Sequence, residues 1–226
     1  MKKALLINHH RPIDSGTILE ILFNSHYSIT IINFIDLKKL SLPDIRSFNL
    51  VCIFGGNASA NDNSSKIKFE LSFISILNKY NIPTVGICLG AQLIAKFYGS
   101  KIVNNVANKS EIGYQKILKP SKKIFNNKNY SFMQFHNQGI NYNSSMDVYA
   151  YGRSFEVDAF KIKTKNIFGF QFHPEVECHS IIRWYKSNNE SISRYKDKLS
   201  KTLENHKTYS KKNYVWLKKT LLKISS

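Results

Sequence analysis

The sequence predicts an α/β fold in which a mostly parallel β-sheet carries helices on both faces. Over the first hundred residues, short apolar runs typical of buried strands alternate with longer segments of helical periodicity. This alternation is typical of parallel sheets, because each strand must return through a crossover helix. From Lys101 to Phe172 the pattern changes to short alternating segments, which predict antiparallel strands at the edge of the sheet.

The N-terminal elements follow one another in a regular order. The predicted strands of this part are Ala4–Asn8, Ser28–Asn33, Leu50–Phe54 and Thr84–Ile87. Helices are predicted between them over Gly16–Asn24 and Lys66–Lys79. The apolar part of the first strand is too short for a signal peptide and is followed at once by polar residues. We therefore assign it to the sheet.

After residue 100 the sequence predicts antiparallel edge strands and then C-terminal helices. The segments expected at the antiparallel edge are Ser131–Phe135, Asp147–Tyr151, Asp158–Ile162 and Ile167–Phe172. Beyond Cys178, apolar residues at helical spacing predict three helices, over residues 181–185, 192–203 and 216–222. We therefore expect a main domain over residues 1–189 and a basic helical extension over residues 190–226.

The extension has a strong positive charge. Residues 178–226 contain twelve Lys/Arg and three Asp/Glu. We favour a helical tail that packs on the domain with its lysines in water. The alternative is a docking surface for an acidic partner subunit.

Composition sets limits on the class of protein. Hydrophobic residues make up 42% of the 226 residues, which is enough for a sizeable core. No run of about 18 apolar residues occurs, so the sequence predicts no membrane span. Cys52, Cys88 and Cys178 are odd in number and lack the spacing of metal ligands. This cysteine usage suits a reducing compartment, and we expect a cytoplasmic protein.

The formal net charge of +18 raises the question of nucleic-acid binding. Only five of the 33 basic residues are arginine, whereas specific phosphate or base recognition favours the planar arginine fork. No nucleic-acid-binding motif accompanies the charge. We therefore expect no specific nucleic-acid partner, and any salt-sensitive binding to polyanions would be incidental.

The strongest candidate for a chemical role is Cys88, within Gly86-Ile87-Cys88-Leu89-Gly90. A predicted strand ends here, and Ala91–Tyr98 has the periodicity of an amphipathic helix. A nucleophile at such a turn is held in a strained conformation that exposes its side chain. The N-terminus of a helix also stabilises a thiolate. The alternative interpretation is a buried core cysteine.

A second candidate segment, Phe172-His173-Pro174-Glu175, follows an apolar run far downstream. Residues two apart on an extended chain point the same way, so Glu175 can orient His173 while His173 reaches a thiol. A nucleophile, a base and an orienting carboxylate together perform covalent acyl transfer. Alone, the segment would be an ordinary loop. With Cys88 it predicts a catalytic triad of Cys88, His173 and Glu175.

These two segments and Phe54-Gly55-Gly56-Asn57 resemble the diagnostic motifs of the class I (triad) glutamine amidotransferases. Glu111-Ile112-Gly113-Tyr114 resembles the stand-alone, GMP-synthase-like branch. The resemblance extends over residues 3–185. It implies a flavodoxin-like three-layer sandwich with a central mostly parallel sheet, antiparallel edge strands and a C-terminal helical extension. Two positions depart from the usual family pattern, with Ala91 in place of histidine and Asn57 in place of proline.

The resemblance also implies roles for individual residues. The backbone N–H groups of Gly56 and Leu89 would form the oxyanion hole. Gln92 matches a glutamine that helps to hold the substrate, and His136 lies in a segment that contacts the amino-acid end of the substrate. The candidates for substrate binding are Gly55, Gln92, Phe135, His136 and Asn137.

The activity implied is hydrolysis of the γ-amide of glutamine through a cysteinyl thioester, which releases glutamate and ammonia. The sequence has no glycine-rich nucleotide loop, so we expect the ammonia acceptor to be a separate synthetase subunit. No metal or organic cofactor is expected. One alternative is a γ-glutamyl hydrolase or peptidase that uses the same triad on a larger γ-glutamyl compound. Another is a non-catalytic basic binding protein on the same fold.

Overall fold

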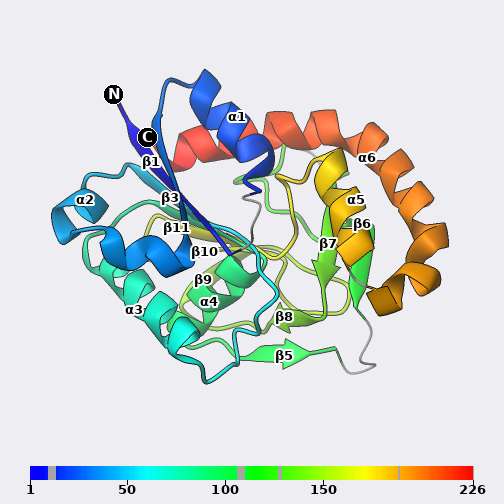
Figure 1. Cartoon of the computed structure of the whole chain (residues 1–226), viewed down its shortest axis with the longest axis horizontal. Helices are drawn as coiled ribbons and strands as arrows, with labels where there is room; N and C mark the ends of the chain where they lie inside the picture. The colour runs from blue at the N-terminus through cyan, green and yellow to red at the C-terminus, as the bar shows by residue number, and fades with distance from the viewer. Residues whose placement is uncertain (10–13, 106–109, 127–128, 188, 226) are drawn as a thin grey trace.

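Seven strands form the central sheet of the computed structural model, which describes residues 1–9, 14–105, 110–126, 129–187 and 189–225 (Figure 1). The strand order is β2-β1-β3-β4-β11-β10-β9. The first five strands in this order are parallel to one another, and β10 is antiparallel to both β11 and β9. The bounds are Lys3–Asn8 (β1), Ser28–Asn33 (β2), Leu50–Ile53 (β3), Thr84–Ile87 (β4), Met146–Ala150 (β9), Ala159–Ile162 (β10) and Ile167–Phe170 (β11).

Helices cover both faces of this sheet and produce three layers. Side chains alternate across each strand. Leu5 and Ile7 of β1 therefore join one buried cluster with α3 and α4, while Ala4 and Leu6 join another with α1 and the end of α6. The sandwich predicted from the sequence is confirmed. The helices of the N-terminal half are Gly16–Asn24 (α1), Phe34–Lys39 (η1, a 3-10 helix), Leu42–Arg46 (α2), Ser65–Lys79 (α3) and Leu89–Phe97 (α4).

Two small sheets lie beside the central one, and one of them corrects the prediction. We expected Ser131–Phe135 at the edge of the central sheet, but β7 pairs with β6 in a separate two-stranded sheet. The error arises because an alternating pattern predicts a strand and its buried face, not its partner. The other small sheet pairs β5 with β8. The bounds are Ile102–Asn104 (β5), Glu111–Lys116 (β6), Ser131–His136 (β7) and Gln138–Ile140 (β8).

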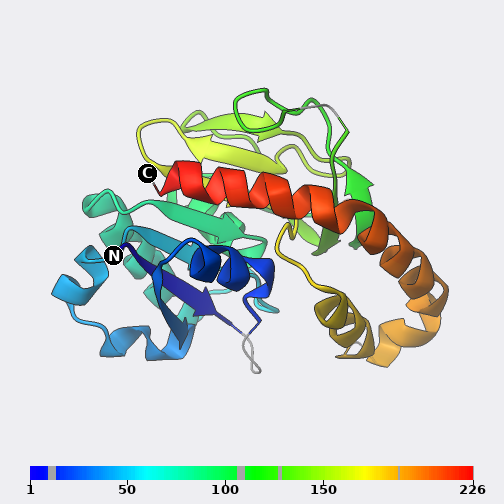
Figure 2. The ribbon, with the colours of Figure 1, turned by 90° about the horizontal axis from the view of Figure 1, so that it is seen from above.

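The C-terminal region contains two described helices where three were predicted. After α5 (Cys178–Ser187), the single helix α6 (Asn189–Ile224) runs for 36 residues along the molecule (Figure 2). Residues 189–224 contain no Gly or Pro, the residues that most often end a helix. The two apolar stretches predicted as separate helices therefore lie on one. The division of the chain at residue 189 stays a prediction.

The far end of α6 is anchored in the core. Trp216 is 3% exposed, and its ring stacks on that of Phe125 with the ring centroids 5.1 Å apart. Its indole N–H donates a hydrogen bond of 2.8 Å to the Ile124 carbonyl oxygen. The second half of α6 thus forms part of one helical layer of the sandwich. None of the helices that the structure describes has the length and apolarity needed to cross a lipid bilayer.

Candidate active site

Cys88 joins β4 directly to α4 in a strained turn. Its backbone angles are φ 50° and ψ −109°, a region that residues other than glycine rarely occupy. The Cys88 N–H donates to the Phe170 carbonyl oxygen at 2.8 Å, and the Cys88 carbonyl accepts from the Gln92 N–H at 3.0 Å. The turn expected from the sequence is therefore present, with the cysteine at the N-terminus of α4.

Glycines are required on both sides of this turn for steric reasons. A Cβ atom on Gly90 would lie 2.1 Å from the Ile53 carbonyl oxygen, and one on Gly86 would lie 2.6 Å from the Gly90 carbonyl carbon. Neither side chain could be placed without moving backbone. The two glycines thus let β3, β4 and α4 approach one another directly, which fixes the position of Cys88.

His173 and Glu175 reach the same edge of the sheet because β11 lies parallel to β4. His173 Nδ1 lies 2.8 Å from Glu175 Oε1, and both side chains are buried. Their backbone is also fixed: the His173 N–H donates to the Met133 carbonyl oxygen at 2.8 Å, and the Thr17 N–H donates to the Glu175 carbonyl oxygen at 2.9 Å. The carboxylate is thus held against the imidazole from behind.

His173 is held in an environment that favours its protonated form. Burial alone would lower the pKa of the imidazole. The charges of Glu175 and Cys88, together with the hydrogen bond to Glu175, overcome this effect and raise the pKa of His173 to about 10. The Trp184 ring packs against the imidazole with the ring centroids 4.7 Å apart. At neutral pH the site therefore holds an imidazolium between a carboxylate and a sulfur.

The glycine loop after β3 closes the other side of the site. A Cβ atom on Gly55 would lie 3.0 Å from His173 Cε1 and 3.8 Å from Cys88 Sγ, so both functional groups face this glycine. A Cβ atom on Gly56 would lie 2.9 Å from Leu89 Cδ2. The two residues predicted to supply oxyanion-hole amides, Gly56 and Leu89, are therefore neighbours, and of the two Gly56 is among the described residues that line the cavity with Cys88. Their catalytic role stays a prediction.

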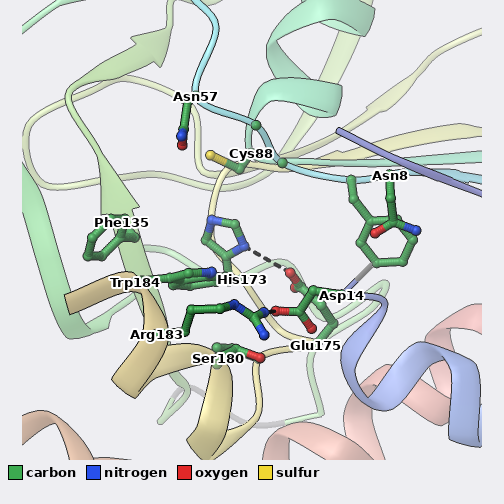
Figure 3. A pocket seen from close by; sticks show the side chains of 14 residues that line it. Asn8, Asp14, Asn57, Cys88, Phe135, His173, Glu175, Ser180, Arg183 and Trp184 are labelled. Carbon is green, nitrogen blue, oxygen red and sulfur yellow. Dashed lines mark hydrogen bonds and ion pairs between the residues drawn. The ribbon is translucent and has the colours of Figure 1, made fainter. Parts of the chain in front are cut away.

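These groups line a cavity of about 200 Å³ (Figure 3). Figure 3 shows the Cys88 sulfur on the same side of the cavity as the His173 ring, and a dashed line joins this ring to Glu175. The residues predicted from the sequence that line the cavity are Gly55, Gly56, Cys88, Phe135, His173 and Glu175. The structure thus brings the three members of the predicted triad to one cavity.

Eight further residues of the lining were not predicted as site residues, and four of them lie just before α1 or on α5. Asp14 lies just before α1 and forms an ion pair with Arg183 of α5. Ser180 and Trp184 of α5 also line the cavity. A signal existed, since Ser180, Arg183 and Trp184 have the i, i+3, i+4 spacing of one helical face. Only the position of α5 in the fold shows which surface that face meets.

A known protein family matches the part of the chain that contains Cys88, His173 and Glu175. A sequence model described as glutamine amidotransferase class-I matches residues 13–183. The chain belongs to this family. The matched region contains Cys88, His173 and Glu175, and it includes α5 as far as Arg183.

Curated relatives of this amidotransferase are named as one subunit of a glutamine-hydrolyzing GMP synthase. The one from Sulfolobus acidocaldarius is 31% identical over 148 residues, covering 61% of this chain and 72% of the relative. Those from Methanococcus aeolicus and Picrophilus torridus are 38% and 35% identical and cover 42% and 56% of this chain. The chain spans 52% and 66% of these two relatives.

Two solved structures share this fold over most or all of the length of the chain. A glutamine amidotransferase from Thermotoga maritima superposes with a TM-score of 0.88 at 24% identity, covering 100% of this chain and 98% of its own. A glutamine amidotransferase from Methylobacillus flagellatus gives a TM-score of 0.73 at 20% identity, covering 84% and 77%. The first match includes α6, so the long C-terminal helix is part of the shared fold.

Gln92 lies apart from the cavity of this amidotransferase. Its side chain is buried and donates hydrogen bonds to the Gln138 carbonyl oxygen at 3.0 Å and to Gln171 Oε1 at 3.1 Å. It is absent from the cavity lining of the described residues. These bonds tie α4 to β8 and to the end of β11. A role in holding the substrate stays a prediction.

His136 is likewise held in the interior. Its Nδ1 donates to the Gln138 carbonyl oxygen at 2.8 Å, and its Nε2 lies 2.8 Å from Gln134 Oε1. Burial lowers the pKa of His136 to about 3. Neither His136 nor the exposed Asn137 is among the described residues that line the cavity. Of the predicted histidine segment, Phe135 alone reaches the lining.

One group of carboxylate and imidazole ligands could approach a metal ion. Within the described ranges, Asp14, Glu177 and His179 place ligand atoms within 4.8 Å of one another. Asp14 is already paired with Arg183, and His179 is exposed. Exposed carboxylates often gather without a metal, so we assign this group no role in the chemistry.

Proposed function

We propose that the protein hydrolyses the γ-amide of glutamine through a cysteinyl thioester, with Cys88, His173 and Glu175 as the triad. The observation that carries this proposal is the convergence of the three side chains on one cavity. The strained turn presents the sulfur, and the 2.8 Å contact with Glu175 orients the imidazole. Membership of the class-I amidotransferases supports the same reaction type.

In the acylation step, the Cys88 thiolate attacks the γ-carbonyl carbon of glutamine. The oxygen gains negative charge, which the N–H groups of Gly56 and Leu89 would stabilise. His173 then gives its proton to the amide nitrogen, the C–N bond breaks and ammonia leaves. A raised pKa suits this step, because His173 must hold a proton before the nitrogen departs.

In the deacylation step, the neutral His173 accepts a proton from water as the water oxygen attacks the thioester carbonyl. The C–S bond breaks, glutamate leaves and Cys88 returns as a thiolate beside the imidazolium. Glu175 keeps the Nδ1–H of His173 directed toward itself, so Nε2 stays free to move protons in both steps.

The ammonia would pass to a separate synthetase. Relatives that are named as one subunit of GMP synthase support this arrangement, and we propose that a partner polypeptide supplies the acceptor chemistry. The identity of the acceptor follows from that partner. A partner-dependent enzyme would hydrolyse glutamine slowly when it is alone and faster with its synthetase.

A γ-glutamyl hydrolase or peptidase is the second candidate. Asp14, Ser180 and Arg183 form a polar wall beyond the triad, which could hold either the amino-acid end of glutamine or the far part of a larger γ-glutamyl compound. Release assays with glutamine and with γ-glutamyl amines and peptides separate the two candidates. A hydrolase would be fully active alone and would prefer the larger compounds.

The decisive experiment is covalent labelling of Cys88 with a glutamine analogue that carries a diazoketone in place of the amide. We expect the wild type to be labelled and Cys88→Ala to be inert, with glutamine hydrolysis reduced by about 10⁴-fold or more. Cys178→Ala, which removes an exposed cysteine, serves as the matched control and should react normally. Labelling that persists in Cys88→Ala would contradict the proposal. An unlabelled wild type would favour the non-catalytic binding protein.

A further inference from the structure

Glu70 is a buried carboxylate on the apolar face of α3. The other buried residues of this face are Ile67, Phe73, Ile74 and Leu77, and Glu70 itself is 5% exposed. Burial of a carboxylate costs free energy that a partner must offset. An apolar side chain would pack at this position without that cost. The choice of glutamate therefore indicates a role for the carboxylate beyond the packing of α3.

The partner of Glu70 is His9, which directly follows β1. Glu70 Oε2 lies 2.8 Å from His9 Nε2, and the two side chains are 6% and 7% exposed. The His9 ring also stacks on the Phe34 ring, with the ring centroids 5.4 Å apart and an angle of 20° between the planes. A hydrogen bond from α3 and a ring from η1 thus fix the imidazole from two directions.

The fixed imidazole lies against the glycine loop of the catalytic cavity. Because β1 and β3 are parallel neighbours, with Ile7 opposite Ile53, the segments that follow them leave the same edge of the sheet side by side. A Cβ atom on Gly56 would lie 2.9 Å from His9 Cβ and 3.0 Å from His9 Cγ, and also 2.9 Å from Leu89 Cδ2. Gly56 is therefore packed between His9 and Leu89, without room for a methyl group.

We infer that His9 and Glu70 are positioning residues for the Gly56 N–H, an inference that rests on the proposed function. Gly56 lines the cavity with Cys88, whereas His9 and Glu70 are not among the described residues of the lining. The pair therefore acts through Gly56 and does not contact the substrate. A donor that shifts by a fraction of an ångström stabilises the developing oxyanion less well, so a fixed His9 supports the acylation and deacylation steps.

Two substitutions remove the hydrogen bond while they fill its space. Glu70→Leu places an apolar side chain on the apolar face of α3, and His9→Phe keeps a ring beside Phe34. We expect each to lower kcat for glutamine hydrolysis at least about tenfold and to change KM less than about twofold, because the oxyanion develops only after the substrate has bound. The double variant should lose no more than either single one, since the two residues act as a unit.

A conservative variant and a matched control complete the set. Glu70→Gln keeps a polar group within reach of His9, so its kcat should recover to within about threefold of the wild-type value. Tyr98→Phe removes a different hydrogen bond of α3, from the Tyr98 hydroxyl to Asn78 Oδ1 at 2.8 Å, and it should leave kcat unchanged. Thermal melts show whether each variant is folded.

Alkylation of Cys88 by iodoacetamide separates the oxyanion hole from the nucleophile, because this reaction consumes the thiolate and forms no oxyanion. In a Cys178→Ala background the remaining cysteine, Cys52, is fully buried, so the rate reports on Cys88. We expect Glu70→Leu and His9→Phe to be alkylated within about twofold of the wild-type rate, since neither residue contacts the sulfur or His173.

The outcomes distinguish this inference from the proposed function. Wild-type kcat in folded Glu70→Leu and His9→Phe overturns the inference alone, as does a parallel loss of kcat and of Cys88 alkylation. Loss of folding in both variants assigns the pair to stability and also overturns it. A wild-type protein that hydrolyses no glutamine overturns the proposed function and the inference together.

Discussion

The two walls of the catalytic cavity are built in different ways. The first, here called the backbone wall, consists of Gly55, Gly56 and Cys88 at the ends of β3 and β4. Its shape comes from main chain packed so closely that a Cβ atom on Gly55 would lie 3.0 Å from the His173 ring. The second, the helix wall, consists of Ser180, Arg183 and Trp184 on α5. Its shape comes from side chains.

This difference assigns different tasks to the two walls. Backbone amides held by sheet and helix cannot move without disturbing the fold, which suits groups that must meet a transition state within a fraction of an ångström. Side chains on a helix can be exchanged while the helix stays in place. We therefore expect the backbone wall to control the chemistry and the helix wall to control which substrate enters. The predictions below test this division, from the largest expected effect to the smallest.

The largest effect concerns Glu175, which lies between the walls and orients His173. Glu175→Gln keeps the size of the side chain but removes the charge that raises the pKa of His173. We expect kcat for glutamine hydrolysis to fall by about 10²–10⁴-fold. Because acylation needs the imidazolium, the alkaline limb of the pH–rate profile should move to lower pH in the variant. A limb at an unchanged pH would show that Glu175 does not set this pKa.

The helix wall depends on α6 staying folded against the sheet. Trp216→Ala removes a buried ring that stacks on Phe125, and it should lower the free energy of unfolding by about 3–5 kcal/mol. Val215→Ala, one residue earlier and 61% exposed, should change stability by less than about 0.5 kcal/mol. Urea unfolding followed by circular dichroism measures both. If residues 190–226 are an independent extension, Trp216→Ala should leave the main transition unchanged.

The backbone wall should not tolerate even one methyl group. In Gly90→Ala the new Cβ atom would meet the Ile53 carbonyl oxygen at 2.1 Å, so β3 and α4 must separate. We expect a loss of about 1–3 kcal/mol in the free energy of unfolding and a loss of labelling at Cys88. Ser72→Ala on the exposed face of α3 is the control and should be nearly neutral. Normal labelling of Cys88 in Gly90→Ala would contradict the expectation that the backbone wall is more sensitive to substitution than the helix wall.

The smallest effect should come from the helix wall. Arg183→Ala breaks the ion pair with Asp14, whose partners are 35% and 13% exposed. A pair this accessible contributes at most about 1 kcal/mol, so KM should rise by no more than about fivefold while kcat stays near the wild-type value. Arg153→Ala, at an exposed position outside the cavity, is the control. A large fall in kcat would show that the helix wall also takes part in the chemistry.

Elements defined by local patterns were predicted well. The bounds of α1, β2 and β4 agree with the prediction, and the turn at Cys88 has the expected strain. Each depends on residues close in the sequence: apolar periodicity, flanking turn residues, and the glycines two residues before and after Cys88. Such constraints act within a few positions of the chain and therefore leave a readable pattern.

Features that depend on distant partners were predicted poorly. The pairing of β7 with β6 was missed, and α6 was divided into two helices. The hydrogen bonds of Gln92 to Gln138 and Gln171 could not be foreseen either, and its role in holding the substrate stays a prediction. No local pattern specifies a partner 46 or 79 residues away in the sequence.

By itself, the sequence determined the class of fold and the strained turn at Cys88, because steric rules for glycine and the alternation of strands and helices act over short stretches of chain. The tertiary structure alone decided that α5 supplies Arg183 and Trp184 to the cavity, and that Glu70 of α3 meets His9 beside Gly56. The physical reason is that packing brings together surfaces whose residues do not constrain one another until the chain has folded.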